Sequence, residues 1–248
     1  MIFFNFLLHL GRISIMLKDG LLQFPKIVKN FDLLVSQMHF IGYGSLPLIM
    51  LTSAFTGMVA TVQTAYQIRD YVPLEYLGVG VGKAIMLELA PVTTALVLAG
   101  RAGAAMAAEI GTMNVTEQID ALKAFSIDPY RYLFLPRFLA SVAMLPLLVI
   151  FANTVGILSG IVIADVALDI EMHTFAESLK IFFKYKDLLG GLMKAVFFGA
   201  IIATMGCHYG FMAKGGAEGV GKATTSAVVA ASVLVLVSDY FVGAFVYA

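Results

Sequence analysis

Long apolar stretches set the strongest constraint on the fold of this chain. Five of them reach the roughly 20 residues that an α-helix needs to cross the hydrocarbon core of a bilayer. A soluble fold could not cover a chain that is 60% hydrophobic and only 13% charged. The sequence therefore predicts an all-α, polytopic membrane protein with spans near Leu46–Tyr66, Ala84–Gly111, Phe138–Ala164, Leu188–Ala213 and Ala223–Tyr247.

The chain divides into an N-terminal segment over residues 1–40 and a transmembrane domain over residues 41–248. Apolar residues recur at helical spacing through the first twenty positions, with charged residues between them, which predicts an amphipathic helix lying in the membrane interface. A poorly inserted first span is the alternative, because Gly11 and Arg12 interrupt the apolar run. The polar segment 68–83 is expected to be a loop or short re-entrant turn, and 165–187 an aqueous loop with a short helix.

Basic residues indicate the orientation of the spans. If the N-terminus is cytoplasmic, ten Lys and Arg residues fall in inner segments and five in outer ones. Because positively charged loops stay inside, the N-terminus is predicted to be cytoplasmic and the C-terminus to lie outside.

Three of the spans carry small residues at every fourth position. Such stripes let helix backbones approach closely in a membrane. We expect them to pack helices within one chain rather than to form a dimer seam: Ala99/Gly103/Ala107/Gly111, Ala152/Gly156/Gly160/Ala164 and Gly191/Ala195/Gly199/Ala203.

A short polar helix is predicted over about residues 114–127, between the second and third spans. Asn114 followed by Glu117 is typical of a helix start, and Asp128-Pro129 of a helix end. The helix is either an ordinary connector or the place where a partner protein docks, its apolar face entering a groove on that partner. The candidate contacts are Glu117, Gln118, Ile119, Asp120 and Leu122.

Chemistry-bearing motifs are few. GAEGVGKAT (Gly216–Thr224) resembles a phosphate-binding loop, but Ala223 stands where the hydroxyl residue belongs and a membrane span precedes it. We expect no nucleotide site and no cofactor in this chain, so that a partner must handle any ATP. One cysteine and four scattered histidines predict neither a disulfide nor a metal cluster. A net charge of zero gives no indication of nucleic acid binding.

Charged residues within the spans are costly and are therefore candidates for function. Glu88, Lys194 and Asp239 lie at similar depths, one to two turns from the predicted outer face. They could form a polar cluster beside a lipid-headgroup path, or Lys194 and Asp239 could simply pair and lock two helices together. Arg101 and Glu109, near the inner boundary, could extend to the interface.

Four blocks of sequence resemble the Mla-type permease family, the membrane subunits of ABC transporters that work with MCE-domain proteins. The resemblance runs from the first span to the C-terminus. Its blocks are ELAPVTTALVLAGRAGAAMAAEIGTMNVTEQIDAL (Glu88–Leu122), DPYRYLFLPR (Asp128–Arg137), GVGKATTSAVV (Gly219–Val229) and SDYF (Ser238–Phe241).

This resemblance implies a homodimer in a bacterial inner membrane that moves phospholipid or a related lipid between the inner and outer membranes. It also implies a cytoplasmic ABC ATPase pair docked on the Thr116–Phe125 region, a periplasmic MCE ring and, in some members, a STAS-domain protein. Gln63, Tyr66 and Glu88 match positions that border the family's lipid cavity. Some relatives have arginine just before the acid, where this chain has Leu87.

Two other functions would fit a membrane protein of this size. One is a scaffold that only anchors an MCE ring, and the other is an intramembrane lipid-modifying enzyme. The enzyme would need a nucleophile or metal cluster, and no such constellation is evident in the sequence.

Overall fold

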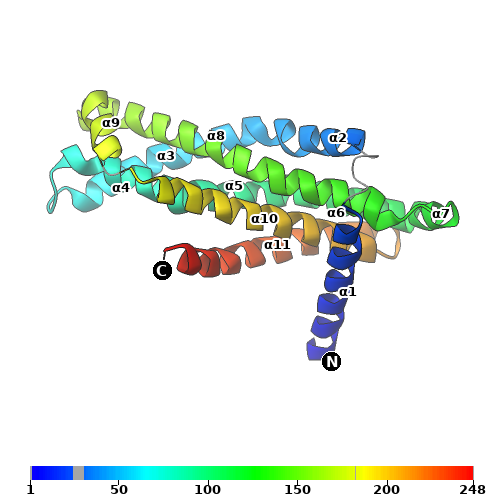
Figure 1. The fold of residues 1–248 in the computed structure, drawn as a ribbon. Coiled ribbons are helices and arrows are strands. Elements are labelled where there is room, and N and C mark those ends of the chain that lie inside the picture. The colour runs from blue at the N-terminus through cyan, green and yellow to red at the C-terminus, as the bar shows by residue number, and fades with distance from the viewer. Residues whose placement is uncertain (1, 25–30, 182, 248) are drawn as a thin grey trace.

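A bundle of long helices forms the body of the molecule (Figure 1). The computed structural model describes residues 2–24, 31–181 and 183–247, and all regular structure in these ranges is helical. Five helical stretches are long and apolar enough to cross a membrane, which confirms the predicted fold class. They are Phe31–Ile68, Leu74–Val115, Tyr130–Leu168, Tyr185–Met212 and Gly216–Val246.

These stretches are built from shorter elements. The first contains α2 (Phe31–Ile41) and α3 (Leu46–Ile68), and the second contains α4 (Leu77–Ala84), α5 (Ala90–Leu98) and α6 (Ala104–Val115). Short α7 (Gln118–Ala124) and α9 (Met172–Ile181) lie at opposite ends of the bundle (Figure 1). The remaining long helices are α8 (Leu135–Leu168), α10 (Tyr185–Met212) and α11 (Gly216–Tyr247).

The N-terminal helix α1 (Ile2–Leu22) runs across the direction of the bundle and projects from its α7 end (Figure 1). This course differs from that of the long helices. Residues 31–40 of the predicted N-terminal segment lie in α2, which packs against α8.

The loop predicted for the segment 68–83 is wrong. The segment 68–83 turns at residues 69–73 and is helical again from Leu74, so Gly78 and Gly82 lie within α4. A Cβ at Gly78 would lie 2.3 Å from the carbonyl oxygen of Phe175 on α9. These glycines therefore permit close helix packing rather than forming a turn.

The glycine-rich stretch before the last span is also helical from Gly216 onward. Only the turn before it needs unusual backbone angles, with φ of +86° at Gly215 and +74° at Gly216. The resemblance of this stretch to a phosphate-binding loop is therefore accidental, since its residues lie in a helix.

The three stripes of small residues pack inside the chain, as predicted, and all twelve residues are buried. The closest approach lies between α3 and α8, where a Cβ at Gly57 would be 2.0 Å from the carbonyl oxygen of Gly156. Gly191 approaches the carbonyl oxygen of Met86 in the same way. This packing brings α10 against the second span and so positions the charged residues of both helices.

Candidate functional site: a buried lysine between two carboxylates

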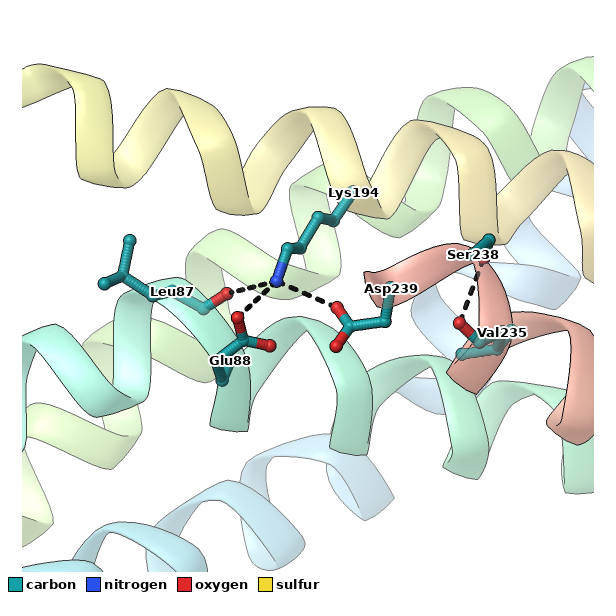
Figure 2. A network of polar contacts seen from close by, with 6 residues as sticks. All are labelled: Leu87, Glu88, Lys194, Val235, Ser238 and Asp239. Carbon is teal, nitrogen blue, oxygen red and sulfur yellow. Dashed lines mark hydrogen bonds and ion pairs between the residues drawn. The ribbon is translucent and has the colours of Figure 1, made fainter. Parts of the chain in front are cut away.

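Three charged residues of the spans, Glu88, Lys194 and Asp239, meet where α10, α11 and the second span come together (Figure 2). Lys194 on α10 has no exposed surface, and its Nζ lies 2.5 Å from Glu88 Oε1 and 2.9 Å from Asp239 Oδ1. A buried ammonium is costly unless carboxylates or hydrogen bonds compensate for its lost hydration. The predicted Lys194–Asp239 pair is therefore present, but it belongs to a larger cluster that includes Glu88.

The backbone of the second span supplies a third oxygen. Lys194 Nζ donates a hydrogen bond to the carbonyl oxygen of Leu87 at 3.2 Å (Figure 2). Pro91 lies four residues after Leu87 and has no N–H to donate, so the usual helical partner of this oxygen is missing. The helix has a π turn at Ile85–Leu89, directly before Pro91. Leu87 thus contributes through its carbonyl group rather than its side chain.

The cluster opens to the protein surface on its Glu88 side. The Glu88 side chain is 51% exposed, against 21% for Asp239 and 0% for Lys194. With two carboxylates and one ammonium, the formal charge of the cluster is −1 when all three ionise. The accessible Glu88 carboxylate can therefore bind the cationic part of a polar group at the surface, while Lys194 stays enclosed.

Gly243 lies beside the cluster on α11, one turn beyond Asp239. A Cβ at Gly243 would make ordinary van der Waals contact, at 3.5 Å, with Cε and Nζ of Lys194. The sequence gives no sign of this proximity, because it depends on how α10 and α11 pack. The Leu87 carbonyl, by contrast, could have been found from the position of Pro91.

Gln63 and Tyr66 lie on α3, which is not one of the helices that carry this cluster. Both side chains are exposed on α3, and the Tyr66 residue is 85% exposed. Tyr66 borders a cavity of about 380 Å³ between the ends of α3 and α8, together with Arg69 and Asp169.

The predicted helix over 114–127 is shorter and starts differently. α6 continues to Val115, the chain bends at Glu117 with a φ of +59°, and α7 covers only Gln118–Ala124. Asn114 does not cap α7: its amide donates hydrogen bonds to the carbonyl oxygens of Phe211 and Ala213. Carbonyl groups in the last turn of a helix lack internal partners, which explains why Asn114 ties α6 to the end of α10.

The apolar face of α7 is occupied by its own chain. Ile119 is buried, and Leu122 is partly buried against the core, so neither offers an open face to a partner. Glu117, Gln118 and Asp120 are exposed. The exposed apolar surface follows α7 instead, at Phe125 (78% exposed) and Ile127 (40% exposed). The candidate contacts chosen from the helical pattern did not include these two residues, although Phe125 closes the Thr116–Phe125 region that the family resemblance implies for docking.

The charges near the other boundary hold helices together rather than extending to the interface. Arg101 donates hydrogen bonds to the carbonyl oxygen of Phe40 and to Ser45 Oγ, at the break between α2 and α3. Arg137, buried on α8, forms an ion pair of 2.8 Å with Glu109. Both contacts lie toward the α7 end. No group of three His, Cys, Asp or Glu side chains that could hold a metal ion occurs among the described residues.

Five apolar helical spans with an ion cluster between three of them define a polytopic α-helical membrane protein. The family model of "Permease MlaE" matches residues 34–245. The chain therefore belongs to the MlaE permease family and is a transport subunit of the ABC transporter class rather than an enzyme.

Individual relatives cover most of the chain. The "Intermembrane phospholipid transport system permease protein MlaE" of Haemophilus influenzae is 37% identical over 98% of this chain and 94% of its own length. A "Probable ABC transporter permease protein" of Rickettsia bellii is 36% identical over 94% of this chain and 90% of its own. A similarly named protein of Synechocystis is 41% identical over 84% of this chain and 79% of its own length.

Proposed function

We propose that this chain is the permease of an ABC transporter that moves phospholipids, or related lipids, between the inner and outer membranes of a bacterium together with an MCE-domain protein. The observation that carries this proposal is the family match over residues 34–245, with a relative of nearly equal length that is named for phospholipid transport. Glu88, Lys194 and Asp239 support it, since they place an accessible charged group at membrane depth.

The proposed lipid path passes the open side of this cluster. A headgroup needs polar partners while it leaves one leaflet, and the half-exposed Glu88 carboxylate beside Lys194 offers them. Lys194 balances the negative charge of Glu88, as an arginine at the position of Leu87 would otherwise do. Gln63 and Tyr66 are proposed to line the same path from α3, where both side chains are exposed.

We further propose a homodimer, because five spans alone can hardly enclose a path for a two-tailed lipid. In the most apolar stretch of the α11 span, only 11% of the residues are buried. Tyr240, Phe241 and Phe245 are exposed. A second copy could enclose, with this one, a path wide enough for a two-tailed lipid. Residues 41–248 would form the permease domain, with residues 1–40 starting at the membrane interface.

ATP would be hydrolysed by a partner ATPase pair that binds the α7 end of the bundle. The proposed contacts are the exposed residues Glu117, Gln118, Asp120 and Phe125. Ile119 and Leu122 hold α7 against the core of its own chain. The MCE ring would bind the opposite end, where α9 lies (Figure 1). A STAS-domain protein could accompany the ATPase.

The α7 end is proposed to face the cytoplasm. Ten Lys and Arg residues of the inner segments, including Lys123 and Lys214, favour this orientation over five at the α9 end. With five spans, the C-terminus would then lie in the periplasm.

Mass spectrometry of the purified complex tests the proposal. The chain, isolated with its ATPase and MCE partners, should carry intact phospholipid, and Glu88→Gln should reduce the amount carried. A scaffold would retain no lipid above the level of an unrelated membrane protein. A lipid-modifying enzyme would instead carry or release a chemically altered lipid, which would contradict the proposal.

A further inference from the structure

We infer that the chain holds a second anion site, distinct from the Lys194 cluster, which binds a phosphate group where α1 crosses α10 at the α7 end. A cavity of about 470 Å³ lies there between α1, α10 and the turn before α8. It is lined by Arg12, Met16, Tyr130, His208, Phe211, Met212 and Lys214.

The lining of this cavity contains basic residues and no acidic ones. Arg12 and Lys214 are both exposed, and neither makes an ion pair among the described residues. Two uncompensated cations that face one space favour an anion, and the guanidinium group of Arg12 matches phosphate oxygens in geometry.

A neighbouring cavity of about 260 Å³ extends the positive surface toward α11. Lys214 and Met212 line both cavities, and Lys222 lines the second one, where it is paired with Glu218 at 2.7 Å. The charge of Lys222 is thus already balanced by Glu218. Arg12 and Lys214 have no acidic partner among the described residues.

A hydrogen bond fixes the helices that form the site. His9 Nδ1 on α1 lies 2.9 Å from Nε2 of the buried His208 on α10. His9 lines the smaller cavity and His208 the larger, so this contact lies at the wall between them. It holds α1 across the bundle and thereby keeps Arg12 opposite Lys214.

The remaining lining residues suit a lipid rather than water alone. Met16, Phe211 and Met212 give the cavity an apolar side, and Tyr130 gives it a hydroxyl group. Basic pockets between membrane helices near the surface bind anionic headgroups, and an amphipathic helix such as α1 lies at headgroup depth. Along α10, the nearest lining residue, His208, lies 14 residues after Lys194, which is about 21 Å along the helix. The site therefore does not depend on which lipid is transported.

Lipid binding to the full-length chain in detergent, followed by native mass spectrometry, tests this inference. Phosphatidylglycerol should bind more tightly than phosphatidylcholine, and Arg12→Gln with Lys214→Gln should weaken phosphatidylglycerol binding by about tenfold or more. Lys18→Gln with Lys180→Gln is the matched control, since it removes the same charge from exposed positions outside the cavity. Arg12→Lys with Lys214→Arg, which keeps both charges, should restore binding.

A second arm identifies the source of the phosphate. Inorganic phosphate at millimolar concentration that displaces phosphatidylglycerol from the wild-type chain would assign the site to free phosphate, and failure to displace would assign it to the lipid headgroup. Both results support recognition of a phosphate group. Unchanged phosphatidylglycerol binding in the cavity variant, or an equal loss in the control variant, would overturn the inference.

Discussion

At the scale of single residues, the buried lysine determines how the charged residues must be understood. The sequence could identify Glu88, Lys194 and Asp239, because charged residues within apolar spans are conspicuous. It could not show that one ammonium serves both carboxylates, since this depends on the rotation of three helices about their axes.

Replacing Lys194 should cost more than replacing either carboxylate. Lys194→Met leaves Glu88 and Asp239 next to each other without a cation. Breaking a fully buried pair costs about 3–5 kcal/mol, and the exposure of Glu88 to solvent lowers this cost. Asp239→Asn leaves the Lys194–Glu88 pair and should cost less. Thermal unfolding in detergent measures both effects.

The control for this series is Lys186→Met, an exposed lysine near the start of the same helix α10, which should unfold like the wild type. The triple variant Lys194→Met, Glu88→Gln, Asp239→Asn should recover part of the loss, because no charge remains unpaired. If Lys194→Met proves as stable as Lys186→Met, the cluster does not stabilise the bundle.

At the scale of elements, the sequence predicts where the spans lie better than how the chain connects them. Apolar length locates each span, but Gly78, Gly80 and Gly82 suggest a loop where α4 packs closely on α9. Asn114 and Glu117 are similarly misleading: they have the spacing of a helix start, but Asn114 binds the end of α10. In both cases a tertiary contact outweighs the local signal, and periodicity contains no information on such contacts.

Three glycines with different surroundings test the helix packing. Gly57→Ala should destabilise the protein by about 1–3 kcal/mol, because its methyl group would collide with the Gly156 carbonyl oxygen and push α3 from α8. Gly156→Ala should cost less, as its nearest neighbours lie at 3.4 Å. Gly100→Ala, with nothing within 4 Å, should be neutral or stabilising by up to roughly 1 kcal/mol. Equal unfolding temperatures for all three would contradict the packing described.

The α7 region yields a prediction that separates docking from folding. Phe125→Asp should release the partner ATPase while the membrane bundle stays folded, because Phe125 is exposed and contributes little to the core. Leu122→Asp should instead loosen α7 itself, since Leu122 packs against the core. Charge reversal at Glu117 should do least, as exposed charges at the edge of a contact contribute about 0–1 kcal/mol. Copurification of the ATPase with each variant measures these effects, and full retention by Phe125→Asp would exclude this surface.

At the scale of the whole molecule, the arrangement of the five spans implies that α7 and α9 lie on opposite sides of the membrane. The one native cysteine, Cys207, is buried, so a maleimide should react only with cysteines that are introduced at the surface. Lys123→Cys should react with an impermeant maleimide only from the cytoplasmic side, and Lys180→Cys only from outside. Labelling of both from one side would contradict the topology.

The central claim is that this chain carries lipid across its bundle when a partner hydrolyses ATP. Its most direct test is transfer of labelled phospholipid in liposomes that contain the chain with its ATPase and MCE partners. Transfer should require ATP, should fall when Glu88→Gln removes the accessible charge, and should stop when Phe125→Asp uncouples the ATPase. Equal transfer with a hydrolysis-deficient ATPase, or from liposomes that lack this chain, would contradict the account.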